Sequence, residues 1–234
     1  MINASLYARI AGLTKPRDTS HMQNYKQRFF ELAMDRGNLK FGEFELKSGR
    51  ISPYFFNAGG FDDGRSLEVL SDCYADAIIE SKLDFDMLFG PAYKGIPLAA
   101  GIAIMLHNKH HRNTPYAYNR KEAKDHGEGG VLVGAQLKGN VLITDDVISA
   151  GTSIRESIHW IQQAGASTCG VAIALDRQER GKGEKSAAQE VTDEFDIPVI
   201  SIAGLDDLID FLDKQSVPNI DIKAIRRYRE AYGI

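Results

Sequence analysis

The sequence predicts an α/β fold in which a mostly parallel, twisted sheet is flanked by helices. Short apolar runs alternate with segments of helical periodicity along the chain, which is the pattern of strand–helix–strand units. The apolar run at residues 141–144 is followed by two acids, Asp145 and Asp146, and then by a turn of small residues. Parallel strands end in this way where their tips face a ligand crevice.

The N-terminal part of this fold is expected to contain a helix and short strands. Residues 22–36 carry apolar side chains such as Tyr25 and Phe29 at helical spacing, and Gly37 is a typical C-terminal cap. Residues 41–58 alternate in polarity and break at Ser48, Gly49 and Pro53, as short strands around a turn do.

The remaining elements follow in order. Ser66 is a residue type that caps helices, and it predicts a helix that runs to about residue 81 with Leu70 and Tyr74 on one face. Further strands are expected at residues 86–90, 115–119, 141–144, 170–175 and 197–202, and further helices at residues 95–107, 152–164, 205–212 and 222–232.

The first 21 residues differ from the rest of the chain. His21 is followed by a second possible start at Met22, a pairing typical of a cloning junction. We therefore expect residues 1–21 to be a vector-derived or mispredicted leader and residues 22–234 to form a single domain. No long apolar stretch precedes a small-residue cleavage site, so a signal peptide is not expected.

Composition narrows the class of protein. The 234 residues carry a net charge of -4, and the isoelectric point is near 5.9, so charge does not favour nucleic acid or anionic membranes. The apolar run at residues 96–106 is too short for a membrane span. Cys73 and Cys169 match no metal-binding spacing. We expect two reduced core thiols in a cytoplasmic protein.

The segment after residues 141–144 has the chemistry of a ribose 5-phosphate site. Backbone N–H groups at residues 149–153 can hold a phosphate at a helix N-terminus, and Asp145 and Asp146 can hold vicinal hydroxyls. The alternative is that the acids bind a metal or cap the turn, which is common in α/β proteins.

Residues 88–97 form a second strand–loop–helix junction. Gly90 and Gly95 permit close backbone approach, and Lys94 places a cation at the helix start. These features fit a second anionic group such as pyrophosphate. Alternatively, the glycines serve only the geometry of the turn.

Residues 119–130 combine potential cations with glycines and contain almost no apolar side chains. Such a segment cannot bury itself, so we expect a mobile, solvated loop or hairpin. One interpretation is a lid that closes over a polyphosphate and protects it from water. The other is a solvated charged face.

Two further places could bind a flat carboxylated ligand. In an extended strand Phe55 and Phe56 point to opposite sides, so one packs inward while the other offers a ring face. Arg177 follows a strand and can bind a carboxylate with two hydrogen bonds. The alternatives are two core phenylalanines and an arginine in a surface ion pair.

Taken together, these segments resemble the orotate phosphoribosyltransferases of the type I phosphoribosyltransferase family. The resemblance covers residues 22–234 and is carried by FELKSGRISPYFFNAG, LFGPAYKGIPLA, YNRKEAKDHGEGG, VLITDDVISAGTSIRES and ALDRQERG. It implies the type I fold with a small N-terminal hood and a flexible lid loop. It also implies the transfer of ribose 5-phosphate from 5-phosphoribosyl 1-diphosphate (PRPP) to orotate, giving orotidine 5′-monophosphate and pyrophosphate in pyrimidine biosynthesis.

The resemblance also assigns roles to individual residues. It places PRPP at Lys47, Tyr93, Lys94, Arg120, Lys121, Lys124, His126, Asp145, Asp146, Val147, Ile148, Ser149, Ala150, Gly151, Thr152 and Ser153. The residues it implies in catalysis are Lys47, Arg120, Lys121, Lys124, His126, Asp145 and Asp146. It places orotate at Phe55, Phe56, Ser149 and Arg177. Ser149 stands where the family usually has threonine, and its hydroxyl preserves the hydrogen-bonding group.

The resemblance implies Mg²⁺ as cofactor, held mainly by substrate oxygens and water rather than by a cage of protein ligands. It further implies a homodimer in which the lid of one subunit reaches the neighbouring site. Two alternatives stay open: a phosphoribosyltransferase for another base, and a regulator that binds PRPP without transferring it. The cationic lid disfavours the regulator, because a sensor does not need to protect PRPP from water. The acidic charge of the chain disfavours a regulator that binds DNA.

Overall fold

The computed structural model describes residues 25–234 except residues 47, 125–129, 150, 182, 216, 218 and 219, and it describes only the backbone of residues 123 and 124. The expected leader at residues 1–21 lies outside this part of the chain. The main sheet has the strand order β5-β4-β3-β6-β7-β8. Its strands are β3 (Met87–Gly90), β4 (Tyr116–Lys124), β5 (Gly130–Gly134), β6 (Asn140–Thr144), β7 (Ser167–Asp176) and β8 (Val199–Gly204).

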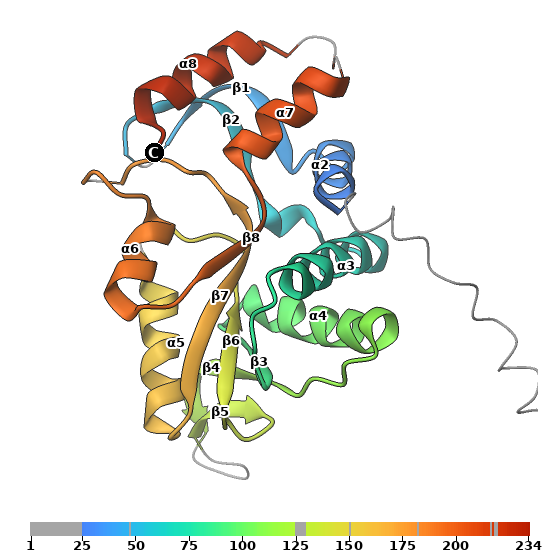
Figure 1. The fold of residues 1–234 in the computed structure, drawn as a ribbon, viewed down its shortest axis with the longest axis vertical. Helices are drawn as coiled ribbons and strands as arrows, with labels where there is room; N and C mark the ends of the chain where they lie inside the picture. The colour runs from blue at the N-terminus through green and yellow to red at the C-terminus, as the bar shows by residue number, and fades with distance from the viewer. Residues whose placement is uncertain are drawn as a thin grey trace, which may run out of the picture.

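All neighbouring strands of this sheet are parallel except the edge strand β5, which runs antiparallel to β4. The predicted α/β class and the mostly parallel sheet are confirmed. Helices α3 (Gly64–Glu80) and α4 (Gly95–His110) cover one face of the sheet, and α5 (Thr152–Gln163) and α6 (Ala187–Phe195) cover the other (Figure 1).

A smaller layer, here called the hood, sits over one end of the sheet at the top of Figure 1. Its two-stranded antiparallel sheet pairs β1 (Leu39–Glu45) with β2 (Ile51–Phe56). The other members are α2 (Tyr25–Asp35), the short helix η2 (Ala58–Gly60), α7 (Leu205–Gln215) and α8 (Ile222–Tyr232). Arg177, which follows β7, donates to Ser52 of β2, so the hood lies close to the carboxyl edge of the main sheet.

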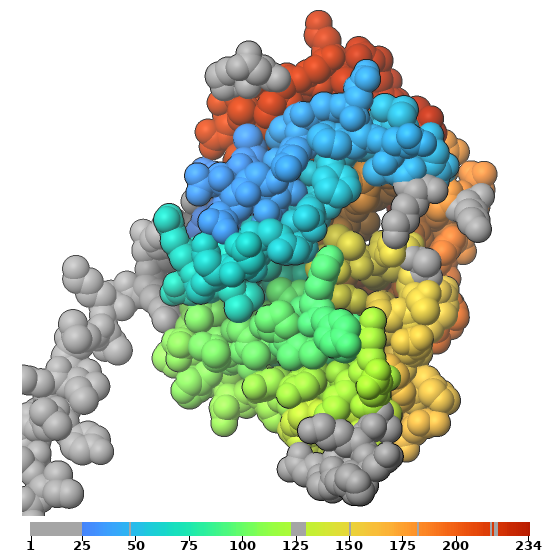
Figure 2. Space-filling model, turned by 180° about the vertical axis from the view of Figure 1, so that it is seen from behind, coloured from blue at the N-terminus to red at the C-terminus, as the bar shows by residue number. Residues whose placement is uncertain are grey.

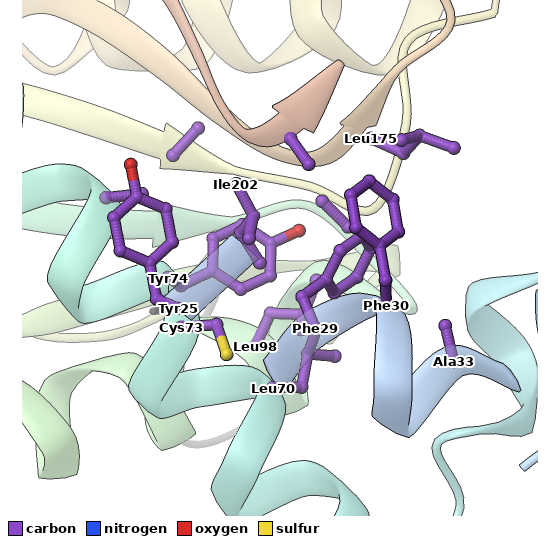
Figure 3. Close-up of a cluster of buried hydrophobic side chains, with 14 of the residues drawn as sticks. Tyr25, Phe29, Phe30, Ala33, Leu70, Cys73, Tyr74, Leu98, Leu175 and Ile202 are labelled. Carbon is purple, nitrogen blue, oxygen red and sulfur yellow. The ribbon is translucent and has the colours of Figure 1, made fainter. Parts of the chain in front are cut away.

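The sheet separates two apolar clusters. Strand β6 serves both, because Leu142 packs on the side of α3 while Val141 and Ile143 pack on the side of α5. This double burial explains why the strand is apolar throughout. Figure 3 shows the first cluster, in which Phe29 and Phe30 of α2 meet side chains of α3 and the sheet.

Several expected elements have different limits in the structure. The cap of α3 is Asp63, which accepts from the backbone N–H of Ser66, so the expectation that Ser66 caps this helix is wrong. Ser66 instead completes a capping box as the third residue of the helix. Strand β4 extends beyond residue 119 into the cationic segment because it pairs with β5.

Helix α6 was not expected from the sequence, although Ser186 and Gln189 form a second capping box at its start. The helix at residues 222–232 is confirmed. Cys73 is buried and Cys169 is half-buried, and both are free thiols. No helix in the described part of the chain is long and apolar enough to cross a membrane.

A charged cluster joins α3 to α4 and α2 away from the carboxyl edge. The side chain of Asp76 is 1% exposed and lies 2.6 Å from Lys109 Nζ, 3.0 Å from His110 Nε2 and 3.9 Å from Arg28 Nη1. Burial by itself raises the pKa of Asp76, but the hydrogen bonds with His110 and Lys109 outweigh burial and hold the pKa below its usual range.

We therefore expect Asp76→Asn to lower the free energy of unfolding by about 2 kcal/mol at pH 7, because it removes charge-assisted hydrogen bonds. A carboxylate with a lowered pKa stabilises the fold above its unfolded pKa, near 3.8, and loses this effect as pH falls through the folded pKa. Urea denaturation from pH 3 to pH 7 tests this. The difference should shrink at the acidic end, and Glu68→Gln, an exposed change on the same helix, should show no such trend.

Candidate functional site

The candidate site lies at the topological switch point of the main sheet, between β3 and β6. Strands β3 and β6 are neighbours, but the chain leaves β3 toward β4 on one side and leaves β6 toward β7 on the other. Ligands of open α/β sheets bind at the carboxyl end of such a switch point. The two loops predicted from sequence, residues 91–94 after β3 and residues 145–151 after β6, therefore flank one crevice.

Two glycines allow the start of α4 to touch both strands. A Cβ added to Gly90 would lie 2.1 Å from the carbonyl oxygen of Gly95, and one added to Gly95 would lie 2.8 Å from the carbonyl oxygen of Thr144. Both distances are too short for a side chain, so the glycines are required by close backbone approach. In the loop between them, the Ala92–Tyr93 peptide bond is cis and Tyr93 is 65% exposed.

Asp145 and Asp146 continue β6 beyond its last strand residue. The N–H of Asp145 donates to Ala172 at 3.0 Å, and the carbonyl of Asp146 accepts from Ala174 at 2.9 Å. The hydroxyl of Tyr74, which is fully buried, donates to the carbonyl of Asp145 at 2.8 Å. These contacts fix the backbone of the acid pair against β7 and α3.

The two carboxylates have different surroundings, and each acid is less than a tenth exposed. Asp145 accepts from Ser153 Oγ at 2.9 Å and from the N–H of Asp146 at 2.9 Å. Burial, followed by the nearby charge of Asp146, raises the pKa of Asp145 to about 6, while the hydrogen bonds from the Asp146 N–H and from Ser153 partly oppose this rise.

Asp146 instead has a cation beside it. Lys94, at the start of α4, places Nζ 2.6 Å from Asp146 Oδ2, and the Lys94 side chain is 56% exposed. The ion pair joins the loop after β3 to the loop after β6. Both partners line a cavity of about 160 Å³ that extends beneath the hood past Ala58 and Phe61.

The turn after the acids leads directly into α5. Gly151 has a left-handed backbone, with φ of 69°, and is the residue before the first turn of α5. The first N–H groups of a helix have no partners within the helix and attract anions. Val147 and Ile148 are half-buried, whereas Ser149 and Thr152 are exposed. Ala150 lies outside the described residues.

The predicted lid contributes two described cations. Arg120 and Lys121 lie on β4, and Lys121 Nζ is 4.8 Å from the centre of the Tyr93 ring. The Arg120 Nη1 atom is buried without a hydrogen-bond partner. Only the backbone of Lys124 is described, as the last residue of β4, and Lys47 and His126 lie outside the described residues.

The residues proposed for the base lie at the hood. Phe56 packs inward near Phe29 and Phe61, whereas Phe55 is 40% exposed and stacks on Phe44 at 5.6 Å. The expectation that the two rings point to opposite sides is confirmed. Arg177 forms an ion pair with Glu179 at 2.6 Å, with side chains that are 26% and 10% exposed. The arginine is ion-paired as the alternative expected, but the pair is largely buried rather than on the surface.

Three residues of this region were missed by sequence reasoning. Tyr74 was assigned only to an apolar helix face, yet its hydroxyl holds the carbonyl of Asp145. Asn119 is buried and accepts from the N–H of Ala92 at 2.8 Å, which ties β4 to the loop after β3. Glu179 contacts two hood tyrosines. No local pattern marks these residues, because each acts across a large sequence separation.

The surface is hollowed at this place. Figure 2 shows yellow atoms, from the chain around the end of β6 and the start of α5, in a recess between the cyan hood and the green α4 layer. Among residues whose side chains are described, no group of three or more His, Cys, Asp or Glu could hold a metal ion. The recess offers carboxylates, cations and helix N–H groups.

Comparison with known proteins agrees with this geometry. The phosphoribosyl transferase domain family matches residues 62–203. The orotate phosphoribosyltransferase of Thioalkalivibrio sulfidiphilus is 60% identical over 213 residues, which are 91% of this chain and all of that protein. The same enzyme of Pseudomonas aeruginosa is 57% identical over the same shares. The crystal structure of Francisella tularensis orotate phosphoribosyltransferase matches with a TM-score of 0.80 and 43% identity, over 88% of this chain and 99% of that one.

The titration of Asp145 provides a test of this site. Removing the neighbouring charge by Asp146→Asn should lower the pKa of Asp145 from about 6, whereas Ser153→Ala should raise it by removing a hydrogen bond to the carboxylate. Carboxyl ¹³C NMR between pH 4 and pH 8 measures both shifts. Ser167→Ala, an exposed change at the start of β7, should leave the titration unchanged. Shifts of the same sign in both site variants would contradict the assignment.

Proposed function

Because the chain belongs to the orotate phosphoribosyltransferase family, we propose that it transfers the ribose 5-phosphate of PRPP to orotate. The products are orotidine 5′-monophosphate and pyrophosphate, and the step belongs to pyrimidine biosynthesis. The fold is that of the type I phosphoribosyltransferases, and the enzyme is a glycosyltransferase of the pentosyltransferase class.

The observation that carries this proposal is the grouping at the switch point. Two carboxylates at the end of β6 lie beside Lys94 and precede the N-terminus of α5. Carboxylates can accept hydrogen bonds from the ribose hydroxyls, and helix N–H groups bind a phosphate. The three parts of PRPP, which are phosphate, ribose and pyrophosphate, therefore each have a matching group nearby.

In the proposed mechanism the chain positions both substrates and stabilises the departing charge. As pyrophosphate leaves, carbon 1 of the ribose gains oxocarbenium-like character and a ring nitrogen of orotate attacks it. Asp145 and Asp146 hold the ribose hydroxyls, and residues 147–153 hold the 5′-phosphate. The cations proposed to bind the pyrophosphate are Lys94, Arg120, Lys121 and Lys124, and Lys47, Tyr93 and His126 are proposed as further PRPP contacts.

Arg120 supports this assignment independently. A buried guanidinium nitrogen without a partner is costly, and Arg120 Nη1 is such an atom. A pyrophosphate oxygen would satisfy it. Orotate is proposed to lie at Phe55, Phe56, Ser149 and Arg177, where Phe56 supports the strand from within and Phe55 presents a ring near the surface.

Mg²⁺ is part of the proposal. The donor set fits an ion that arrives with PRPP, because Asp145 and Asp146 supply carboxylate oxygens while Mg²⁺ usually keeps water and substrate phosphate oxygens as ligands. When bound, Mg²⁺ supplies positive charge to the pyrophosphate. We further propose a cytoplasmic homodimer in which the lid of one subunit acts in the neighbouring site, with Lys124 and His126 contributed in trans.

The decisive experiment follows orotate by its ultraviolet absorbance in the presence of PRPP and Mg²⁺, with one component omitted in each control. Orotate should disappear only in the complete mixture and yield orotidine 5′-monophosphate. Competition by purine bases tests the alternative of another base. A folded protein that binds PRPP and consumes no base would instead be a regulator.

We expect the positive charge of Lys94 to contribute to the rate of this reaction. Lys94→Ala should lower kcat/KM for PRPP by about 100-fold, the usual effect of losing one group that stabilises developing charge. Steady-state kinetics with PRPP as the varied substrate measures the effect. Lys138→Ala, an exposed change that also removes one positive charge, should remain within twofold of the parent protein.

Action of the lid in trans is tested by subunit exchange. Lys124→Ala and Asp146→Asn proteins should each have low activity, because one lacks a lid cation and the other a ribose-binding carboxylate. In a mixed dimer one site would combine an intact acid pair with an intact lid from its neighbour, so about half of the mixed dimers' sites should recover activity. Mass spectrometry verifies the exchange, and persistent inactivity after it would exclude lid action in trans.

A further inference from the structure

The strongest unassigned feature near the site is a carboxylate that joins three parts of the fold. Glu179 Oε1 accepts from Tyr54 of β2 at 3.0 Å, and Glu179 Oε2 accepts from Tyr228 of α8 at 3.0 Å. The same carboxylate pairs with Arg177 Nη2 at 2.6 Å. The Glu179 side chain is only 10% exposed. Both carboxylate oxygens therefore have polar partners within a largely buried region.

Arg177 is held from other directions as well. Its guanidinium carbon lies 4.3 Å from the centre of the Tyr54 ring, a cation–π contact, and Nη2 donates to Ser52 Oγ at 3.1 Å. The Arg177 side chain remains 26% exposed. The contacts of this guanidinium with Ser52 and Glu179 are both made through Nη2, on the side of the hood.

The parts that hold Arg177 are themselves held by packing and hydrogen bonds. Tyr54 is completely buried in the hood and packs edge-on against Tyr228 at 6.3 Å. The backbone around Glu179 is fixed from α8, because Arg180 donates its N–H to Tyr232 at 2.8 Å. From the hood, Arg50 donates to the carbonyls of Arg180 and Gly181. The Glu179 carboxylate is therefore held by contacts that do not involve Arg177.

This arrangement solves a problem that an arginine poses for recognition. A free arginine side chain loses about 2 kcal/mol of rotamer entropy when it is ordered, and that cost weakens ligand binding. In this protein the side chain of Arg177 is already ordered by its contacts in the folded state, so ligand binding does not have to order it. The two tyrosines tie Glu179 to the hood, and the ion pair with Arg177 compensates its largely buried charge. The same ion pair, together with the cation–π contact of Arg177 with Tyr54, fixes the orientation of the guanidinium.

We propose that Glu179 is a positioning residue that, fixed by Tyr54 and Tyr228, holds the Arg177 guanidinium in place for the carboxylate of orotate. The inference rests on the proposed function, since it assigns selectivity for a carboxylated base to that same site. It extends the base site to α8, an element far from the site in sequence. The hood is thereby part of substrate selection as well as a cover.

The test measures binding of the base separately from binding of PRPP. Glu179→Gln keeps the size of the side chain but removes its charge, and we expect KM for orotate to rise about tenfold, equivalent to 1.4 kcal/mol. KM for PRPP should stay within twofold. Inhibition by uracil, which lacks the carboxylate, should be unchanged. Glu184→Gln, an identical change at a side chain that is 93% exposed, is the matched control.

A double-mutant cycle tests whether Glu179 affects orotate binding through Arg177. If Glu179 acts through Arg177, the protein with both Arg177→Gln and Glu179→Gln should bind orotate no more weakly than Arg177→Gln alone. Additive losses would overturn the inference, because a purely structural role would act whether or not the arginine is present. Weakened inhibition by uracil in Glu179→Gln would overturn it as well.

A milder substitution provides a control for misfolding of the Glu179→Gln protein. Tyr228→Phe removes one hydroxyl from the network, and it should raise KM for orotate about threefold while the melting temperature stays high enough for assay at 25 °C. If Glu179→Gln does not fold, this variant decides, and an unchanged KM for orotate overturns the inference. A parent protein that consumes no orotate would instead refute the proposed function, so the two failures are distinguishable.

Discussion

The backbone pairing of β6 with β7 is the constraint on which the site depends. The ladder continues through both acids, so neither can retreat from the other, and two carboxylates are held side by side in a place that is largely closed to water. Burial and the neighbouring charge of Asp146 raise the pKa of Asp145, so this arrangement destabilises its ionised form. Hydrogen bonds from Ser153 and from the Asp146 N–H offset part of this destabilisation. A ligand that donates hydrogen bonds from hydroxyl groups would stabilise the two carboxylates further. Closely spaced buried acids are for this reason typical of binding sites.

The other parts of the site follow from how closely elements approach this strand. Gly90 and Gly95 bring α4 against β3 and the end of β6, and this contact places Lys94 where it can reach Asp146. Asn119 then ties the loop after β3 to β4, the strand that leads into the lid. The proposed phosphate-binding side is thus built by neighbouring strands of the main sheet, whereas the proposed base-binding side is built where the hood meets the end of β7.

The difference between these two sides explains what the sequence could and could not predict. The acids, the turn and the start of α5 are consecutive residues, so the pattern at residues 141–153 carries both the local structure and its chemistry. Helix α8 was also predictable, because its apolar spacing is regular. The partners of Arg177 and Glu179 were not, because Ser52 and Tyr54 reach Arg177, and Tyr228 reaches Glu179, through tertiary packing. Helix α6 was overlooked although Ser186 and Gln189 carried a recognisable start signal.

The contacts of Glu179 have a consequence for how the chain acquires its activity. Its two tyrosine partners lie 125 residues before it and 49 residues after it in sequence. Contacts of such separation form late, because the intervening chain must first be ordered. During synthesis, the β6 segment emerges from the ribosome well before α8 does. The turn after β6 can therefore form early in a nascent chain, whereas the network around Glu179 is complete only after α8 has docked.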